Sequence, residues 1–245
     1  MRLDVFFTPG ELGPELPGRV VVVDVLRATS TMVEALANGA RALFPVATAD
    51  DAARIAQNIG RDSVLLCGER KGLPIEGFDL GNSPAEFDGE RVAELSLVMT
   101  TSNGTRAFLA VAERWAGPGD DGTGAILAGS LLNLSAAARA LADGGGAAAI
   151  VCAGRDGRFG LDDALCAGAL IRALEDAGAD PVLNDAGAAA RSLVGRRRRF
   201  VPALEETAAG RHLNDIGRAE DIAFCARVDR TDVVPRFRDR KITAE

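Results

Sequence analysis

The chain carries an apolar run that leads into a polar turn, Val20-Val21-Val22-Val23-Asp24-Val25-Leu26-Arg27-Ala28-Thr29-Ser30-Thr31. Consecutive valines are typical of a strand that is covered on both faces, as in a parallel sheet. The residues after the turn have helical character, and we expect Thr31 and Glu34 to form a capping box that opens a helix over residues 32–37. A strand that passes directly into a helix is the repeating unit of an α/β fold.

Other segments of the chain repeat this pattern. Apolar, strand-like runs occur at residues 3–7, 42–46, 63–67, 96–100, 124–128 and 147–153. Between them apolar residues recur at helical spacing, as at Ala52, Ile55, Ala56 and Ile59. The alternation predicts a three-layer α/β/α fold with a largely parallel or mixed sheet. We expect one domain over residues 1–237, with one or two strands in 222–237, and a frayed polar tail at 238–245.

Composition and charge limit the kinds of molecule that the protein is expected to bind. The 245 residues are 47% hydrophobic and carry a net charge of −7, which argues against a nucleic acid or an acidic membrane surface as partner. In such a chain the four arginines at 196–199 are expected to form a solvated face rather than an RNA site. A homo-oligomer is compatible with the sequence.

The cysteines and the apolar runs bear on the compartment. No apolar run reaches the roughly 20 residues that span a bilayer. Cys67, Cys152, Cys166 and Cys225 have no CxxC spacing, which argues against a zinc site or a disulfide scaffold and favours a reducing cytoplasm. We expect Cys67 and Cys152 to be small core residues rather than nucleophiles.

Ligands of open α/β sheets bind beyond the carboxyl ends of the strands, so the residues after each strand are the candidates for a site. After the quoted strand come Asp24 and Arg27, followed by the hydroxyls of Thr29, Ser30 and Thr31. A helix N-terminus with hydroxyls and an arginine suits a phosphate, because free N–H groups and positive charge converge there. The alternative for Thr31 is a plain helix cap.

Three other strand ends carry similar chemistry. Glu69 and Arg70 follow one strand and precede a long irregular stretch, residues 73–86, of the kind that often binds ligands. Another strand is followed by residues that could cradle an oxyanion, Ser102, Asn103, Gly104 and Thr105. Arg155 follows the strand at 147–153, before Asp162 and Asp163 open a helix; the alternative for Asp162 is again a cap.

Together these groups suit Mg²⁺ and a phosphate ester. Carboxylates such as Asp24 and Glu69 are ligands that Mg²⁺ prefers, and the planar forks of Arg27, Arg70 and Arg155 hold oxyanions. The chain has a single histidine, His212, which we expect in a solvated structural role, so a histidine-based triad or a multi-histidine metal site would be impossible or strained. No GxxxxGK[ST] or GxGxxG motif is present. We therefore expect a Mg²⁺-dependent phosphatase acting on a small, multiply anionic phosphate ester.

Other functions remain open at this point. The same groups could form a non-catalytic module that binds small phosphorylated anions, or a phosphotransferase rather than a hydrolase. A structural or interaction protein would instead show an exposed apolar patch. If a phosphoenzyme forms, Asp24 is the candidate nucleophile.

Four stretches of the chain resemble the motifs of a known family. These are residues 23–31, residues 68–70 with 77–84, residues 100–105, and residues 152–155 with Asp162 and Asp163. In this order they are similar to the signatures of the 2-phosphosulfolactate phosphatase (ComB) family, from about residue 1 to about residue 237. The resemblance implies an α/β/α fold of the ComB type and Mg²⁺-dependent removal of phosphate from 2-phosphosulfolactate, a step toward coenzyme M in methanogens.

Overall fold

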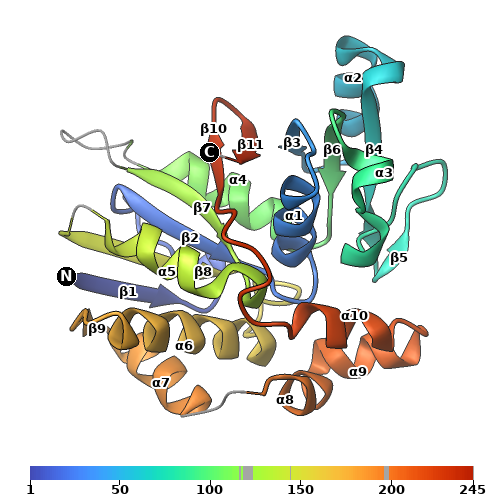
Figure 1. The fold of residues 1–245 in the computed structure, drawn as a ribbon. Helices are drawn as coiled ribbons and strands as arrows, with labels where there is room; N and C mark the ends of the chain where they lie inside the picture. Colours follow the sequence, from blue (N-terminus) through green and yellow to red (C-terminus); the bar gives the residue numbers. More distant parts are fainter. Residues whose placement is uncertain (116, 118–123, 144, 196–198, 245) are drawn as a thin grey trace.

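The computed structural model describes residues 1–115, 117, 124–143, 145–195 and 199–244 (Figure 1). Three of the four arginines at 196–199 therefore lie outside the described residues. The strands are β1 (Arg2–Phe6), β2 (Arg19–Val23), β3 (Ala42–Pro45), β4 (Val64–Arg70), β5 (Leu73–Pro74), β6 (Ser96–Thr100), β7 (Ala125–Gly129), β8 (Ala147–Cys152), β9 (Val182–Leu183), β10 (Pro235–Arg238) and β11 (Lys241–Ala244).

In this part of the chain the strands form a single mixed sheet. Its order is β5-β4-β6-β3-β11-β10-β7-β2-β8-β1-β9. The strands next to β2 are parallel to it, with Val20 opposite Ile126 of β7 and Ala149 of β8. The expected mixed sheet is confirmed, and the run of valines lies near its centre.

Helices cover both faces of the sheet (Figure 1). They are α1 (Ala28–Ala37), α2 (Ala49–Ile59), α3 (Gly89–Val92), α4 (Gly104–Arg114), α5 (Leu134–Ala142), α6 (Leu161–Asp176), α7 (Asp185–Val194), α8 (Val201–Glu205), α9 (Ala208–Asp215) and α10 (Ala219–Cys225). Along β2 the side chains alternate, as the pleat requires. Val20 and Val22 pack in a core with residues of α1 and α4, whereas Val21 and Val23 pack in a core with residues of α5 and α6. This confirms the three-layer arrangement.

The first helix begins earlier than predicted. Helix α1 starts at Ala28 directly after Arg27, so Thr31 lies inside its first turn and does not form a capping box with Glu34. The Thr31 hydroxyl donates instead to the carbonyl of Asn82, and the Glu34 carboxylate pairs with Arg230. Because the helix starts close to Asp24, only four residues separate the end of β2 from the helix (residues 24–27).

The C-terminal segment also differs from expectation. Residues 219–225 form helix α10 rather than a strand, and the strand after it, β10, begins only at Pro235. The predicted frayed tail at 238–245 is wrong, because residues 241–244 form β11, which pairs with β10 and contacts β3. Ile242 is fully buried in the core that contains α1 and α4. Burial of this apolar residue holds an otherwise polar strand inside the sheet.

No helix in the described part of the chain is long and apolar enough to cross a membrane.

Candidate active site

A cavity of about 370 Å³ lies where the carboxyl ends of β2, β4, β6 and β8 meet the C-terminal helices. The strands contribute the residues that follow them, and α9 contributes His212 and Leu213. The predicted site residues on its wall are Asp24, Arg27, Glu69, Ser102, Asn103 and Arg155. Strand ends that are far apart in sequence therefore converge on one cavity, as the strand-end argument predicts.

Two carboxylates, Asp24 and Asp162, line the cavity from different elements. Asp24 follows β2 and Asp162 lies in the first turn of α6, and both are more than nine-tenths buried. Burial, together with the charge of Asp162, raises the pKa of Asp24 to about 7. Burial also raises the pKa of Asp162 to about 6, opposed by N–H groups of the α6 N-terminus and by the charge of Arg155. Either group can therefore gain or lose a proton near neutral pH.

Asp163, beside Asp162, joins two strand ends. One oxygen, Oδ1, accepts from the N–H of Val25 at 2.9 Å, and Oδ2 accepts from the N–H of Gly154 at 3.0 Å. Asp163 is only 2% exposed, and burial raises its pKa well above the usual value. Its carboxyl group joins the loop after β2 to the loop after β8, from which Asp24 and Arg155 reach the same cavity.

Glu69 plays a similar joining role for the strand ends of β4 and β6. Its Oε1 accepts from the N–H of Ser102 at 2.7 Å, and its Oε2 accepts from the N–H of Gly72 at 2.7 Å. The Ser102 hydroxyl donates to Oε2 at 3.2 Å. Three protein donors therefore already occupy the Glu69 carboxylate, which was predicted as a metal ligand.

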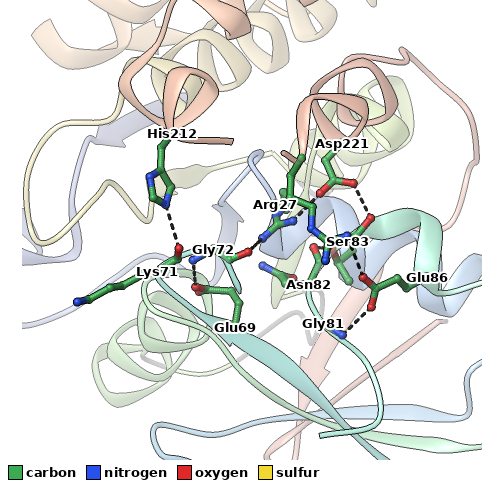
Figure 2. Close-up of polar contacts among 12 residues, drawn as sticks. Arg27, Glu69, Lys71, Gly72, Gly81, Asn82, Ser83, Glu86, His212 and Asp221 are labelled. Atoms are coloured by element: carbon green, nitrogen blue, oxygen red, sulfur yellow. Dashed lines mark hydrogen bonds and ion pairs between the residues drawn. The ribbon is translucent and has the colours of Figure 1, made fainter. Parts of the chain in front are cut away.

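Basic side chains from several loops line the cavity. Lys71 and Arg155 line it, and the His212 ring bonds to the carbonyl of Lys71 at 3.0 Å (Figure 2). Arg27 is 3% exposed, and its guanidinium contacts the Asp221 carboxylate at 2.5 Å and the Gly72 carbonyl at 2.6 Å. The cavity thus combines a carboxylate pair with cationic groups suited to anions.

Several residues predicted to bind substrate do not line the cavity. The Thr29 hydroxyl donates to the Asp24 carbonyl and accepts from the Asp24 N–H, and the Ser30 hydroxyl donates to the Val25 carbonyl. The Thr31 hydroxyl donates to the carbonyl of Asn82. The three hydroxyls therefore hold the backbone around Asp24 in place. A binding role for these three side chains stays a prediction, and their hydroxyls bond to the backbone, with Ser30 also bonded to the Cys225 thiol.

Of the residues that follow β6, some line the cavity and others do not. Ser102 and Asn103 line the cavity, but Gly104 and Thr105 do not. Thr105 exchanges hydrogen bonds with Thr101. A Cβ on Gly104 would come within 2.7 Å of Asp24 Oδ2 and 2.5 Å of the Ala28 Cβ, so only glycine lets α4 approach Asp24.

Arg70, predicted as catalytic, lies outside the cavity wall. Its guanidinium donates to the carbonyl of Glu69 at 2.7 Å and to the hydroxyl of Thr100 at 3.0 Å. Arg27 and Arg155, in contrast, both reach the cavity. Arg27, Arg70 and Arg155, each of which follows a different strand, therefore do not all line the same cavity in this structure.

Other wall residues were not selected as binding residues from the sequence. They are Leu26, Lys71, Gly72, Asn82, Gly154, Asp156, Asp162, Asp163, Ala209, His212 and Leu213. The signal for Asp162 was present, because an acid in the first turn after β8 can serve a ligand as well as a helix cap. His212 lies on α9, lines the cavity and is partly exposed, with its ring bonded to the Lys71 carbonyl, so the expected solvated structural role stays a prediction. No sequence pattern reveals that α9 docks there.

The donor set fits a hard divalent cation that is shared with a ligand. In the described residues no group of three or more His, Cys, Asp or Glu side chains is placed to hold a metal ion. Asp24 and Asp162 nevertheless supply carboxylate oxygens to one cavity, and the buried Oδ1 of Asn82, on the same wall, has no hydrogen-bond partner in this structure. Mg²⁺ is commonly held by one or two carboxylates together with water and substrate phosphate, so this donor set suits it.

Comparison with known proteins identifies the family. The family model described as 2-phosphosulpholactate phosphatase matches residues 6–240. A protein of Caldanaerobacter subterraneus subsp. tengcongensis is 38% identical over 221 residues, covering 90% of this chain and 88% of its own. Proteins of Pseudothermotoga lettingae (38% identical) and Gloeobacter violaceus (37%) each cover 96% of this chain and 95% of their own. All three are named probable 2-phosphosulfolactate phosphatase. This chain belongs to the 2-phosphosulpholactate phosphatase family.

Proposed function

We propose that this protein is a phosphoric monoester hydrolase that converts 2-phosphosulfolactate and water into sulfolactate and phosphate. One observation carries the proposal beyond family membership. Asp24 and Asp162, two buried carboxyl groups with raised pKa values, share a cavity with Lys71 and Arg155 at the strand ends. Titratable groups poised near neutral pH beside anion-binding cations are what hydrolysis of an anionic ester requires.

The charge distribution of the cavity supports this substrate class. 2-Phosphosulfolactate carries a phosphate, a sulfonate and a carboxylate, so it needs several cationic or N–H partners. Lys71 and Arg155 come from the loops after β4 and β8, on different parts of the wall, and Arg27 lies deeper. We assign Arg27 to the phosphate and the more exposed Lys71 and Arg155 to the other anionic groups. Binding of these non-reacting groups orients the ester for reaction.

Membership of a phosphatase family suggests a divalent metal ion, and we propose Mg²⁺. Asp24 and Asp162 would hold it, with Glu69 as a third carboxylate only if it exchanged one of its present donors. When bound, the ion supplies positive charge that polarises the phosphoryl group and lowers the pKa of bound water.

Hydrolysis requires that a water oxygen form a bond to phosphorus while the bond from phosphorus to the ester oxygen breaks. The attacking water gives up a proton to a carboxylate of the cavity, and the departing oxygen takes up a proton from solvent. Asp162 or Asp24, ionised as cation binding requires, can accept the proton from the attacking water, and a raised pKa makes each carboxylate a stronger base. Ser102 and Asn103 line the same wall and can donate to the non-bridging oxygens.

A cytoplasmic location is part of the proposal. Cys67, Cys152, Cys166 and Cys225 are free thiols in the structure, which agrees with a reducing compartment.

A screen of purified protein tests the proposal. Phosphate release is measured from 2-phosphosulfolactate, from 2-phospholactate and from a simple alkyl phosphate, each with Mg²⁺ and with a chelator. We expect release from 2-phosphosulfolactate that depends on Mg²⁺ and is much slower from the alkyl phosphate. Binding of 2-phosphosulfolactate without release of phosphate would instead support a binding module, and transfer of the phosphoryl group to added alcohols would support a phosphotransferase.

A further inference from the structure

Asp221 on α10 is buried at 4% exposure and contacts Arg27 without lining the cavity itself. Its Oδ2 accepts from Arg27 Nη1 at 2.5 Å, and its Oδ1 accepts from the Ser83 hydroxyl at 2.5 Å (Figure 2). Among the described residues, the side chain of Asp221 therefore connects to the site through Arg27 and through the loop that carries Ser83 and its neighbour Asn82. Both Arg27 and Asn82 are wall residues.

The other side of the Arg27 guanidinium is also held. Nη2 donates to the Gly72 carbonyl at 2.6 Å, and the Gly72 N–H donates to Glu69 at 2.7 Å (Figure 2). Guanidinium has five N–H donors in a rigid plane, so two fixed contacts set the orientation of the remaining three. Arg27 is therefore held between α10 on one side and the turn after β4 on the other.

We propose that Asp221 is the positioning residue for Arg27 in the phosphatase reaction. This inference rests on the proposed function. With its carboxylate in place, Asp221 neutralises the buried guanidinium and fixes the plane that Arg27 presents to the phosphoryl group. Without it, Arg27 keeps its charge but loses one of its two anchors, so the transition state loses more than the bound substrate does.

A second carboxylate–arginine pair in the chain provides a matched control. Glu34 is also 4% exposed and accepts from Arg230 Nε at 2.9 Å and Nη2 at 2.8 Å. Neither Glu34 nor Arg230 lines the cavity. Arg230 is more exposed than Arg27, but Glu34→Gln likewise removes a buried carboxylate from an arginine, and it does so away from the cavity. The loss of the Glu34 charge thus tests folding alone, whereas loss of the Asp221 charge tests folding and positioning together.

The experiment compares Asp221→Asn, Glu34→Gln and wild type in steady-state hydrolysis of 2-phosphosulfolactate, with thermal midpoints measured in parallel. We expect Asp221→Asn to lower kcat by about 10- to 100-fold, the range found for groups that orient an active-site residue, with KM changed less than threefold. Glu34→Gln should lower the thermal midpoint and leave kcat within twofold of wild type. Replacement by glutamate, Asp221→Glu, should restore part of kcat because it returns the charge.

Each result of this experiment either supports or overturns the positioning role of Asp221. A kcat for Asp221→Asn equal to that of wild type would overturn it, as would an equal loss of kcat in Glu34→Gln. Should Asp221→Asn fail to fold, Asp221→Glu decides instead: it keeps the charge but moves the carboxylate by one methylene, and lowered kcat at nearly unchanged KM supports positioning, whereas wild-type kcat overturns it. Wild-type protein that releases no phosphate would overturn the proposed function, and the inference with it, whereas an active wild type with an unaffected Asp221→Asn would overturn the inference alone.

Discussion

Asp24 and Asp162 line the same cavity from the end of β2 and the start of α6, and the charge of Asp162 adds to burial in raising the pKa of Asp24 to about 7. Two buried carboxylates that repel each other are unfavourable unless a proton or a cation lies between them. The proposed function therefore predicts that pH, cation binding and reaction chemistry are linked through this pair.

The first prediction concerns stability in the absence of metal. The ordinary pKa of Asp24 is 3.8 and its folded value is about 7, so the folded protein binds this proton more tightly than the unfolded chain does. The free energy of unfolding should therefore fall as the pH rises from 3.8 through about 7. Asp24→Asn has no such proton, so its thermal midpoint in chelator should depend less on pH.

Thermal midpoints at pH 5 and pH 8 check this expectation. At pH 8 the Asp24→Asn variant should be at least as stable as wild type, and a gain of about 1 kcal/mol would raise the midpoint by roughly 2–4 °C. Asp88→Asn, at an exposed helix cap, is the control that leaves the cavity unchanged. An Asp24→Asn variant with the same pH dependence as wild type would contradict the raised pKa.

The second prediction concerns the cation. Protons compete with Mg²⁺ for the same carboxylates, so Mg²⁺ should stabilise the protein more at pH 8 than at pH 5.5. A cation at one hundred times its Kd stabilises by about 2.7 kcal/mol, which a thermal shift resolves. Asp162→Asn should reduce the shift strongly. Equal shifts at both pH values, or an unaltered shift in Asp162→Asn, would exclude this pair as the cation site.

The third prediction concerns the different roles of Arg155 and Arg70. Arg155 lines the cavity beside Asp162 and donates to the Ala208 carbonyl at 2.9 Å, whereas the contacts of Arg70 are to Thr100 and Glu69. We expect Arg155→Ala to raise KM for 2-phosphosulfolactate about tenfold, equivalent to about 1.4 kcal/mol. KM for a simple alkyl phosphate should change little. Measured on both substrates, an equal loss would assign Arg155 to the phosphate group, and a larger effect from Arg70→Ala would contradict the division seen here.

The fourth prediction concerns the thiols. Cys67 and Cys152 are fully buried, as expected from their positions in apolar runs, and burial raises the pKa of each thiol well above its usual value. An alkylating reagent should therefore leave the native enzyme active and react only after unfolding. Cys67→Ala and Cys152→Ala should lower stability rather than kcat. Rapid inactivation from which substrate protects would show that one thiol is accessible and functional.

Much of the sheet follows from local sequence. The apolar runs expected as strands correspond to β1–β4 and β6–β8, because burial on both faces requires long apolar stretches. Of the C-terminal hairpin, β10 lies at the end of the range where strands were expected, whereas β11, in the expected tail, was missed. The two strands are four residues long and carry several charges, and they are stabilised by burial of Ile242 and by pairing with β7 and β3, which are far away in the sequence.

Some residues of the site could likewise be predicted from the sequence, whereas others could not. Asp24, Arg27 and Arg155 could be predicted because each directly follows a strand, and parallel strand ends converge. The same rule cannot say which way a side chain turns, so it selected Arg70 and the buried hydroxyls of Thr29 and Ser30. His212 and Asp221 come from the C-terminal helices, and their approach to the cavity depends on tertiary packing that no local pattern encodes.

The central claim is that Asp24 and Asp162 act together in hydrolysis of 2-phosphosulfolactate. The most direct test is the rate of phosphate release from this compound by wild type, Asp24→Asn, Asp162→Asn and the double variant, with Mg²⁺ at pH 7. We predict that each single variant loses at least a hundredfold in kcat while remaining folded, and that the double variant loses little more, because the two residues form one functional unit. Retention of wild-type kcat in either single variant, or losses that simply multiply in the double variant, would contradict the account.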